Sequence, residues 1–259
     1  MSTEVSRLHV LLCGFEILEK TVSTRDRGGR FILAEPVSAY LLETARGYVL
    51  VDAGLNSALV HDPALREEHY TKRGIRPPVI LPEHELAHQL EQIGVRPEDV
   101  SHVILTHMHL DHAGNLGMFR HARISVQRAE HAYAFSPDHG PAWFERDYNL
   151  PDLRWDLVEG DWEAMPGLEV VLTRGHTPGH QSVVVTLEET GSVVLVGDAG
   201  DLAENFTDEV LPGESVDDEA ALASIRRLKQ IARERDAELL LGHDPQLIQK
   251  VRLAPESYA

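Results

Sequence analysis

A chain of 259 residues, of which 42% are hydrophobic, can bury a sizeable core, and this composition excludes an intrinsically disordered protein. Its 42 acidic residues outnumber 24 basic ones, and the net charge of −18 argues against nucleic acid or an anionic membrane surface as a partner. No apolar run approaches the roughly 20 residues that cross a bilayer, and the first residues lack the pattern of a secretory signal. We therefore expect a cytoplasmic protein. Without a linker or low-complexity tract, residues 1–259 are predicted to form a single domain.

Short apolar runs between turn residues predict strands through most of the chain. The expected strands are 8–12, 40–43, 48–52, 103–105, 124–127, 153–158, 168–173, 182–187, 193–196 and 239–241. Helical spacing of apolar residues predicts helices over 83–93, 128–135 and 217–235, the last with Asp217 or Asp218 as its N-cap. The segment 61–82 is rich in proline and charge, and we expect it to be a lid or a homodimer element.

Two apolar strands end in nearly the same pattern. Residues 49–54 read Val-Leu-Val-Asp-Ala-Gly, and residues 194–200 read Val-Leu-Val-Gly-Asp-Ala-Gly. Aspartate and glycine after a strand are a common turn signal, so chance is one explanation of the match. The other explanation is a chain of two similar β-rich halves, which would bring two strand ends together at one seam.

A dense group of metal-ligand side chains follows the predicted strand 103–105. His107, His109, Asp111 and His112 lie on a loop at a strand end, where a rigid frame holds side chains that face a cleft. His107 and His109 can point the same way in extended backbone because they are two residues apart. Imidazole and carboxylate ligands suit zinc or a similar metal. One tetrahedral site rarely takes four ligands from so short a loop, so we predict two metal ions.

Three further ligand-type residues follow other predicted strands. His180, Asp198 and His243 each come after an apolar run and directly follow a glycine, in a chain with 15 histidines. Each one alone is typical of a turn or a cap, but together with the four-ligand loop they predict a shared metal centre. We interpret His176 and Asp52 as side chains that orient a ligand histidine.

The run 107–112, His-Met-His-Leu-Asp-His, resembles the HxHxDH signature of the metallo-β-lactamase superfamily. This resemblance implies an α+β fold, the αβ/βα four-layer sandwich, which accounts for the repeated strand end. Within the superfamily, the chain is similar almost end to end to the N-acyl homoserine lactone lactonases. The segments that carry the similarity are 40–44, 51–54, 111–114, 126–128, 178–182, 204–206, 224–229 and 242–244.

The resemblance also implies a ligand set and a reaction. One metal ion would be held by His107, His109 and His180, the second by Asp111, His112 and His243, and both by a bridging Asp198. The two divalent ions, zinc by default with manganese, iron or cobalt as alternatives, would share a hydroxide of lowered pKa that attacks the carbonyl carbon of a lactone. The expected substrate is a small molecule, an N-acyl homoserine lactone or a related lactone.

Two positions depart from the lactonase pattern. A tyrosine that contacts the substrate carbonyl in these lactonases is replaced by Asp201, and a phenylalanine inside the metal loop is replaced by Leu110. Either Asp201 is protonated and acts as a general acid, or it is a solvated loop residue and another group replaces the phenol; we favour the second interpretation. The candidate catalytic carboxylates are thus Asp111, Asp198 and Asp201.

Two other classes of function compete with a lactonase. One is another ester or thioester hydrolase of the same superfamily, although a β-lactamase with a cysteine ligand is disfavoured because Cys13, the one cysteine, lies far from every motif. The other is a metal-binding protein or small-molecule sensor without catalysis. A complete ligand set is hard to explain in a passive binder, so we rank the sensor last.

Overall fold

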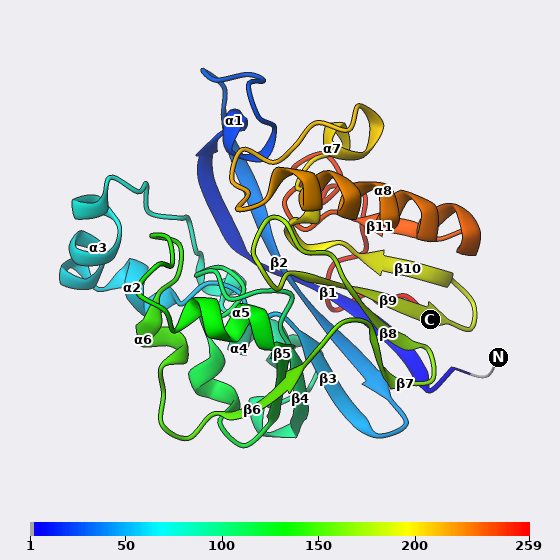
Figure 1. Cartoon of the computed structure of the whole chain (residues 1–259). Coiled ribbons are helices and arrows are strands. Elements are labelled where there is room, and N and C mark those ends of the chain that lie inside the picture. The colour runs from blue at the N-terminus through cyan, green and yellow to red at the C-terminus, as the bar shows by residue number, and fades with distance from the viewer. Residues whose placement is uncertain (1–2) are drawn as a thin grey trace.

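Two β-sheets form the centre of the fold, and helices lie on both outer sides of the pair (Figure 1). The computed structural model describes residues 3–259. The first sheet has the strand order β1-β2-β3-β4-β5-β6, and the second has the order β11-β10-β9-β8-β7. The strands are β1 Val5–Glu19, β2 Ile32–Thr44, β3 Gly47–Val51, β4 Val100–Ile104, β5 Arg123–Gln127, β6 Arg154–Val158, β7 Trp162–Met165, β8 Leu168–Leu172, β9 Gln181–Leu187, β10 Gly191–Leu195 and β11 Glu238–Leu240.

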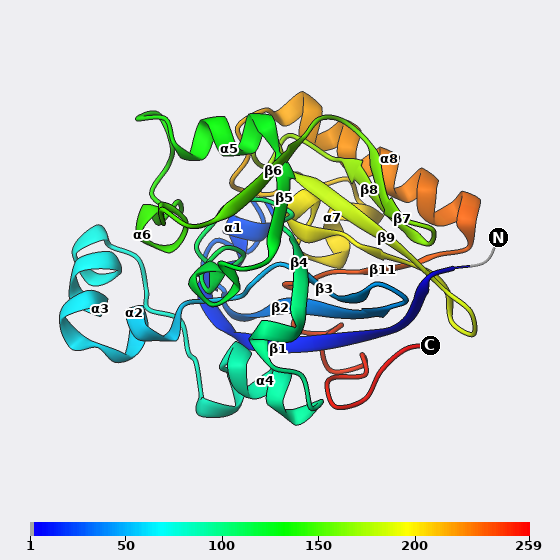
Figure 2. The same ribbon diagram turned by 90° about the horizontal axis from the view of Figure 1, so that it is seen from below.

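Most helices are short, and the longest covers the second sheet. Figure 2 shows α4 outside the first sheet and α8 on the opposite side of the molecule, along the second. The α-helices are α1 Lys20–Ser23, α2 Ser57–His61, α3 Pro63–His69, α4 Leu86–Gln92, α5 Arg128–Ala134, α6 Glu145–Tyr148, α7 Ala203–Thr207 and α8 Asp218–Arg235. Short 3₁₀ helices are Thr71–Arg73, Pro82–His84, Pro97–Asp99, Leu116–Phe119 and Gly197–Ala199.

Alternation of side chains along the strands produces three apolar layers. Leu41 on β2 packs outward in one cluster with Leu90 of α4, while its neighbour Leu42 packs inward against the second sheet in a cluster with Val185 of β9. On the far face of β9, Val184 belongs to a third cluster that α8 covers. Helix, sheet, sheet and helix therefore follow one another, which confirms the four-layer sandwich.

Parallel pairing decides where loops meet. β3, β4, β5 and β6 run parallel to one another, so their carboxyl ends lie at one edge of the first sheet. In the second sheet β10 and β11 are parallel, and their carboxyl ends reach the same end of the molecule. Loops from both sheets consequently converge at one end of the sandwich, where side chains from distant parts of the sequence come together.

The strand predictions are confirmed in type, with differences in length. β1 is a 15-residue strand instead of the five residues expected, since its apolar and polar residues continue to pair with β2 beyond a bulge at Gly14. The short strand β7 was not predicted. The segment 61–82 contains α3, and α8 begins after the N-cap Asp217, whose side chain accepts a hydrogen bond from the backbone N–H of Ala220 (3.0 Å). Within residues 3–259, no helix combines the length and apolar character needed to span a bilayer.

Candidate metal centre

The ligand-type residues predicted from the sequence lie at strand ends of both sheets. The loop 107–112 leaves β4, Asp198 lies in the 3₁₀ turn after β10, and His243 follows β11. The segment after β8 supplies His176, so both sheets contribute to one buried cluster. Residues more than 130 positions apart in the chain thereby become neighbours, as the 3.4 Å between the Nε2 atoms of His112 and His243 shows.

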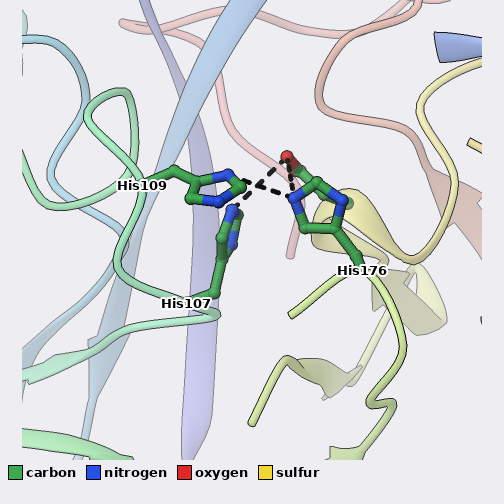
Figure 3. Close-up of side chains that lie close together, drawn as sticks. His107, His109 and His176 are labelled. Carbon is green, nitrogen blue, oxygen red and sulfur yellow. Dashed lines mark hydrogen bonds and ion pairs between the residues drawn. The ribbon is translucent and has the colours of Figure 1, made fainter. Parts of the chain in front are cut away.

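The first group of ligand atoms comes from His107, His109, His176 and Asp198. One atom of each lies within 4.8 Å of the others, and all four side chains are buried. The three imidazoles lie close together in Figure 3, where dashed lines join His107 and His176 to a neighbouring carboxylate oxygen and His109 to His176. His107 Nε2 is buried without a hydrogen-bond partner and lies 3.5 Å from Asp198 Oδ2, which is costly unless a ligand lies between the two atoms. His109 turns its Nδ1 toward His176 Nε2 (3.1 Å).

The second group comes from Asp111, His112, His243 and again Asp198. The Nε2 atom of His112 lies 3.1 Å from Asp111 Oδ2 and 3.1 Å from Asp198 Oδ1, and His243 Nε2 is also 3.1 Å from Asp198 Oδ1. The other carboxylate oxygen of Asp198 faces the first group, 3.3 Å from His176 Nε2. Asp198 thus has one oxygen on each group, the arrangement required of a bridging ligand.

Charges within the centre divide its imidazoles into two kinds. Burial opposes a positive charge on His112 and His243, but the adjacent carboxylates of Asp111 and Asp198 outweigh it and raise the pKa of both imidazoles well above its usual value. Burial lowers the pKa of His107 well below its usual value, so that this ring stays neutral. A neutral imidazole with a free nitrogen can bind a cation without first losing a proton.

His180, predicted as a ligand, does not lie in either group. Its Nε2 accepts a hydrogen bond from the backbone N–H of Asp198 (2.9 Å), and its Nδ1 lies 3.1 Å from the carbonyl oxygen of Thr173. Burial lowers the pKa of His180 to about 3, so the neutral ring keeps the lone pair that this contact needs. Both ring nitrogens are used, and His176 lies in the first group instead. His180 instead fixes the turn that carries Asp198.

The close approach of His180 also explains a glycine. Gly197 has φ of +62°, and a Cβ at this position would lie only 2.6 Å from His180 Nε2. Any larger residue would push the ring away from the Asp198 backbone. The sequence pattern Gly-Asp at 197–198 is therefore needed both for the left-handed turn and for the hydrogen bond that positions the bridging carboxylate.

Two buried carboxylates hold the ligand loops in place. Asp52, at the end of β3, accepts hydrogen bonds from the Nδ1 of His112 (2.8 Å) and from the backbone N–H of Thr106 (2.7 Å), so it contacts the ring of one of the predicted ligand histidines. Glu130 on α5 accepts from the backbone N–H groups of Met108 (3.0 Å) and Gly179 (3.1 Å). Sequence reasoning missed Glu130, because nothing in a helical Arg-Ala-Glu-His run marks it as a link between two loops.

A pocket of about 340 Å³ opens directly beside the ligand groups. Its wall includes Asp201, which is only 7% exposed and has a buried Oδ1 without a partner. Burial and then the charge of Asp198 raise the pKa of Asp201 well above its usual value. The favoured interpretation of Asp201 as a solvated loop residue is therefore wrong, since its side chain is buried in the pocket wall. Glu16 and Glu35, which sequence reasoning also missed, line the same wall.

Comparison with known proteins agrees with this geometry. Residues 32–243 match the family model described as the metallo-beta-lactamase superfamily. The chain belongs to this superfamily. Among its curated relatives in the superfamily, an N-acyl homoserine lactonase of Bacillus cereus is 35% identical over 252 residues, which are 97% of this chain and 98% of that protein. An N-acyl homoserine lactonase of Bacillus thuringiensis is 37% identical over 225 residues, 87% of this chain and 88% of the relative.

Solved structures of the superfamily show the same arrangement of the chain. An N-acyl homoserine lactone hydrolase with the product N-hexanoyl-L-homoserine bound at its catalytic metal centre superposes with a TM-score of 0.88 at 34% identity, covering 99% of this chain and 100% of the other. A quorum-quenching N-acyl homoserine lactone lactonase gives a TM-score of 0.86 at 33% identity, with both chains fully covered.

Proposed function

We propose that this protein is a metal-dependent N-acyl homoserine lactone lactonase, a quorum-quenching hydrolase that opens the lactone ring with water. The observation that carries the proposal is the pocket beside two ligand groups joined by Asp198, in a fold that matches a hydrolase with a ring-opened product at its metal centre. Full-length similarity to named lactonases supports it. Another ester or thioester hydrolase of the superfamily is the alternative, and the test below separates the two.

The donor atoms fit two divalent cations. One group offers three imidazoles and a carboxylate oxygen, the other two imidazoles and two carboxylate oxygens, and both are buried. Mixed nitrogen and oxygen donors suit zinc, our proposed ion, and also manganese, iron or cobalt. The unpartnered Nε2 atom of His107, which lies 3.5 Å from Asp198 Oδ2, is the observation that an expected ion would explain. We propose His107, His109 and His176 for one ion, Asp111, His112 and His243 for the other, and Asp198 as the bridge.

When bound, the ions would supply Lewis acidity, which lowers the pKa of water and polarises the lactone carbonyl. The chain's own residues orient the reaction. Asp52 and the backbone around Thr106 fix the ring of His112, and His180 fixes the turn of Asp198. The pocket that would hold the lactone is lined by Asp111 and Asp201.

Hydrolysis forms one carbon–oxygen bond between water and the carbonyl carbon and breaks the ring ester bond. The products are a carboxylate and an alcohol, so one proton must reach the leaving alkoxide and one is released. We propose Asp201 as the group that delivers the proton, because its buried carboxyl lines the pocket next to the bridging turn. A cytoplasmic location, a homodimer and a single domain over 1–259 remain predictions from the sequence.

The test is a substrate panel on purified protein loaded with zinc, or with manganese or cobalt. N-hexanoyl homoserine lactone, simple alkyl lactones, an open-chain ester and a thioester are offered, and acid release is followed by pH-stat and chromatography. We expect ring opening of the acylated lactone with the highest kcat/KM. Turnover of the thioester or ester without turnover of any lactone would replace this proposal with the alternative hydrolase.

A further inference from the structure

A buried acidic wall lies on the side of the pocket formed by the first two strands. Glu16 on β1 and Glu35 on β2 are directly paired across the antiparallel ladder, so their side chains stand next to each other on one face. Both line the pocket that contains ligand residues of both groups. Two like charges in this position destabilise a sheet, and an arrangement that costs stability calls for a reason.

Glu35 is the deepest member of this wall and has an unused oxygen. The residue is 1% exposed, and its Oε1 has no hydrogen-bond partner. Its other oxygen, Oε2, accepts a hydrogen bond from the hydroxyl of Ser23 (2.6 Å). A buried carboxyl oxygen without a hydrogen-bond donor destabilises the protein, so a donor that reached Oε1 would remove this cost.

The carboxyl group of Glu35 is held rigidly. The carbonyl oxygen of Ser23 accepts a hydrogen bond from the side-chain nitrogen of Asn205 (2.9 Å), and Asn205 Oδ1 accepts from the backbone N–H of Leu202 (2.8 Å). This chain of contacts ties α1 to the start of α7. The Glu35 carboxyl therefore cannot turn toward another donor without breaking the Ser23 contact, so Oε1 stays without a partner in a side chain that lines the pocket.

Glu35 lines the pocket in which an acylated lactone would lie. The amide nitrogen of such a substrate is attached to the carbon beside the lactone carbonyl, so it must lie next to the ligand groups when the carbonyl does. Glu35 lies close enough for the charges of His243 and Asp198 to act on its carboxyl, while burial, the larger effect, raises its pKa. Its Oε1 accepts a hydrogen bond from N–H whether or not the group carries a proton.

We infer that Glu35 is a specificity-determining residue, whose buried Oε1 accepts the N–H of the substrate's secondary amide and so selects amide-bearing lactones over alkyl lactones. This inference rests on the proposed lactonase function and deepens it. A site built to bond an N–H discriminates against substrates that lack it, because the acceptor then stays unpaired.

The test compares two lactones of ten carbons on the zinc-loaded protein. One is N-hexanoyl homoserine lactone, and the other is γ-decalactone, which has no N–H. For Glu35→Met we expect kcat/KM to fall about tenfold for the amide lactone and to change little for the alkyl lactone, since a hydrogen bond to the carboxyl acceptor is lost only in the first case. Glu35→Gln keeps an acceptor oxygen and should retain part of the preference.

Two matched variants guard against a purely structural effect. Glu19 lines the same pocket but is exposed, and Ser23→Ala removes the contact to Oε2 while leaving Oε1. Glu19→Gln should alter both lactones alike. Ser23→Ala releases the Glu35 carboxyl from the contact that holds it, so it should lower kcat/KM for the amide lactone more than for the alkyl lactone. Calorimetry of the ring-opened products gives a readout separate from turnover, and Glu35→Met should weaken binding of N-hexanoyl-homoserine but not of 4-hydroxydecanoate.

The outcomes separate the two proposals. Equal losses for both lactones in Glu35→Met, or an unchanged preference, would overturn the role of Glu35 while lactonase activity stands. If the wild-type protein opens neither lactone, the proposed function itself fails. The inference is supported if Glu35→Met loses the preference for the amide lactone. Glu35→Gln should then keep part of this preference, and Glu19→Gln should keep all of it.

Discussion

The exchange of roles between His176 and His180 gives the sharpest test of the metal centre. His176 offers Nε2 to the first ligand group and holds its Nδ1 3.0 Å from the carbonyl oxygen of Glu214. In His176→Ala the first group keeps two imidazoles and one carboxylate oxygen. Removing even an outer partner of a ligand lowers metal affinity by about 10–100-fold, so loss of the ligand itself should exceed about 100-fold.

His180→Ala should act on stability instead. The Asp198 N–H would lose its acceptor inside a buried turn, which costs about 1–3 kcal/mol, and removal of a fully buried ring adds a cavity. We expect two zinc ions per chain in this variant with a lower melting temperature, and one tightly held ion in His176→Ala. Zinc content after dialysis against a chelator, together with thermal unfolding, measures both. Retention of two tight ions in His176→Ala combined with loss of one in His180→Ala would refute the assignment.

Two further predictions concern buried aspartates. Asp52→Ala removes the acceptor of His112 Nδ1, and we expect metal affinity at the second group to fall about 10–100-fold in a chelator competition, while an unchanged affinity would contradict the role of Asp52. Asp147 is buried against Asn56, and burial raises its pKa from 3.8 to about 7. Because the folded protein holds this proton more tightly, stability from Asp147 is full below pH 4 and is lost as pH rises to about 7, by about 4 kcal/mol. Asp147→Asn should remove this pH dependence in urea unfolding, and identical pH profiles for both proteins would rule it out.

The fold and most of the ligand set could be predicted because they rest on local signals. Apolar runs marked the strands, and ligand-type residues directly after them marked the end of the sandwich where loops meet. The loop 107–112 contains so many ligand-type residues that it predicts a metal centre even when the pairing of the strands is unknown. Asp52 was foreseen for the same reason, because it ends a strand at that edge.

The choice between His176 and His180 could not be made from sequence. Both follow β8 on one short loop, and both end next to Asp198 in space. What separates them is whether a ring nitrogen is already used, and that depends on the backbone of the turn after β10. Only the folded geometry shows that Gly197 leaves room for His180 to approach this backbone, where its Nε2 accepts a hydrogen bond.

The residues missed altogether depend on pairing over long distances. Glu16 and Glu35 meet through the register of β1 with β2, and Glu130 reaches two loops from a helix. Their own sequence contexts are those of ordinary strand and helix residues, so no pattern marks them. Such residues are nevertheless the ones that distinguish members of a superfamily, because the ligand loop is shared while the pocket wall is not.

The acidic wall bears on the open question of the substrate. Where related lactonases are expected to present a tyrosine hydroxyl, this pocket presents the buried carboxyl of Asp201, with Glu16 and Glu35 on the adjoining wall. Burial raises the pKa of all three carboxyl groups, so the wall tends to hold its protons; an uncharged wall offers no counter-charge to an ionic substrate and suits a neutral lactone. Glu35 Oε1, the unpartnered acceptor in the same wall, favours a substrate that carries an N–H group. Together, charge and hydrogen bonding narrow the substrate to a neutral lactone that carries an amide.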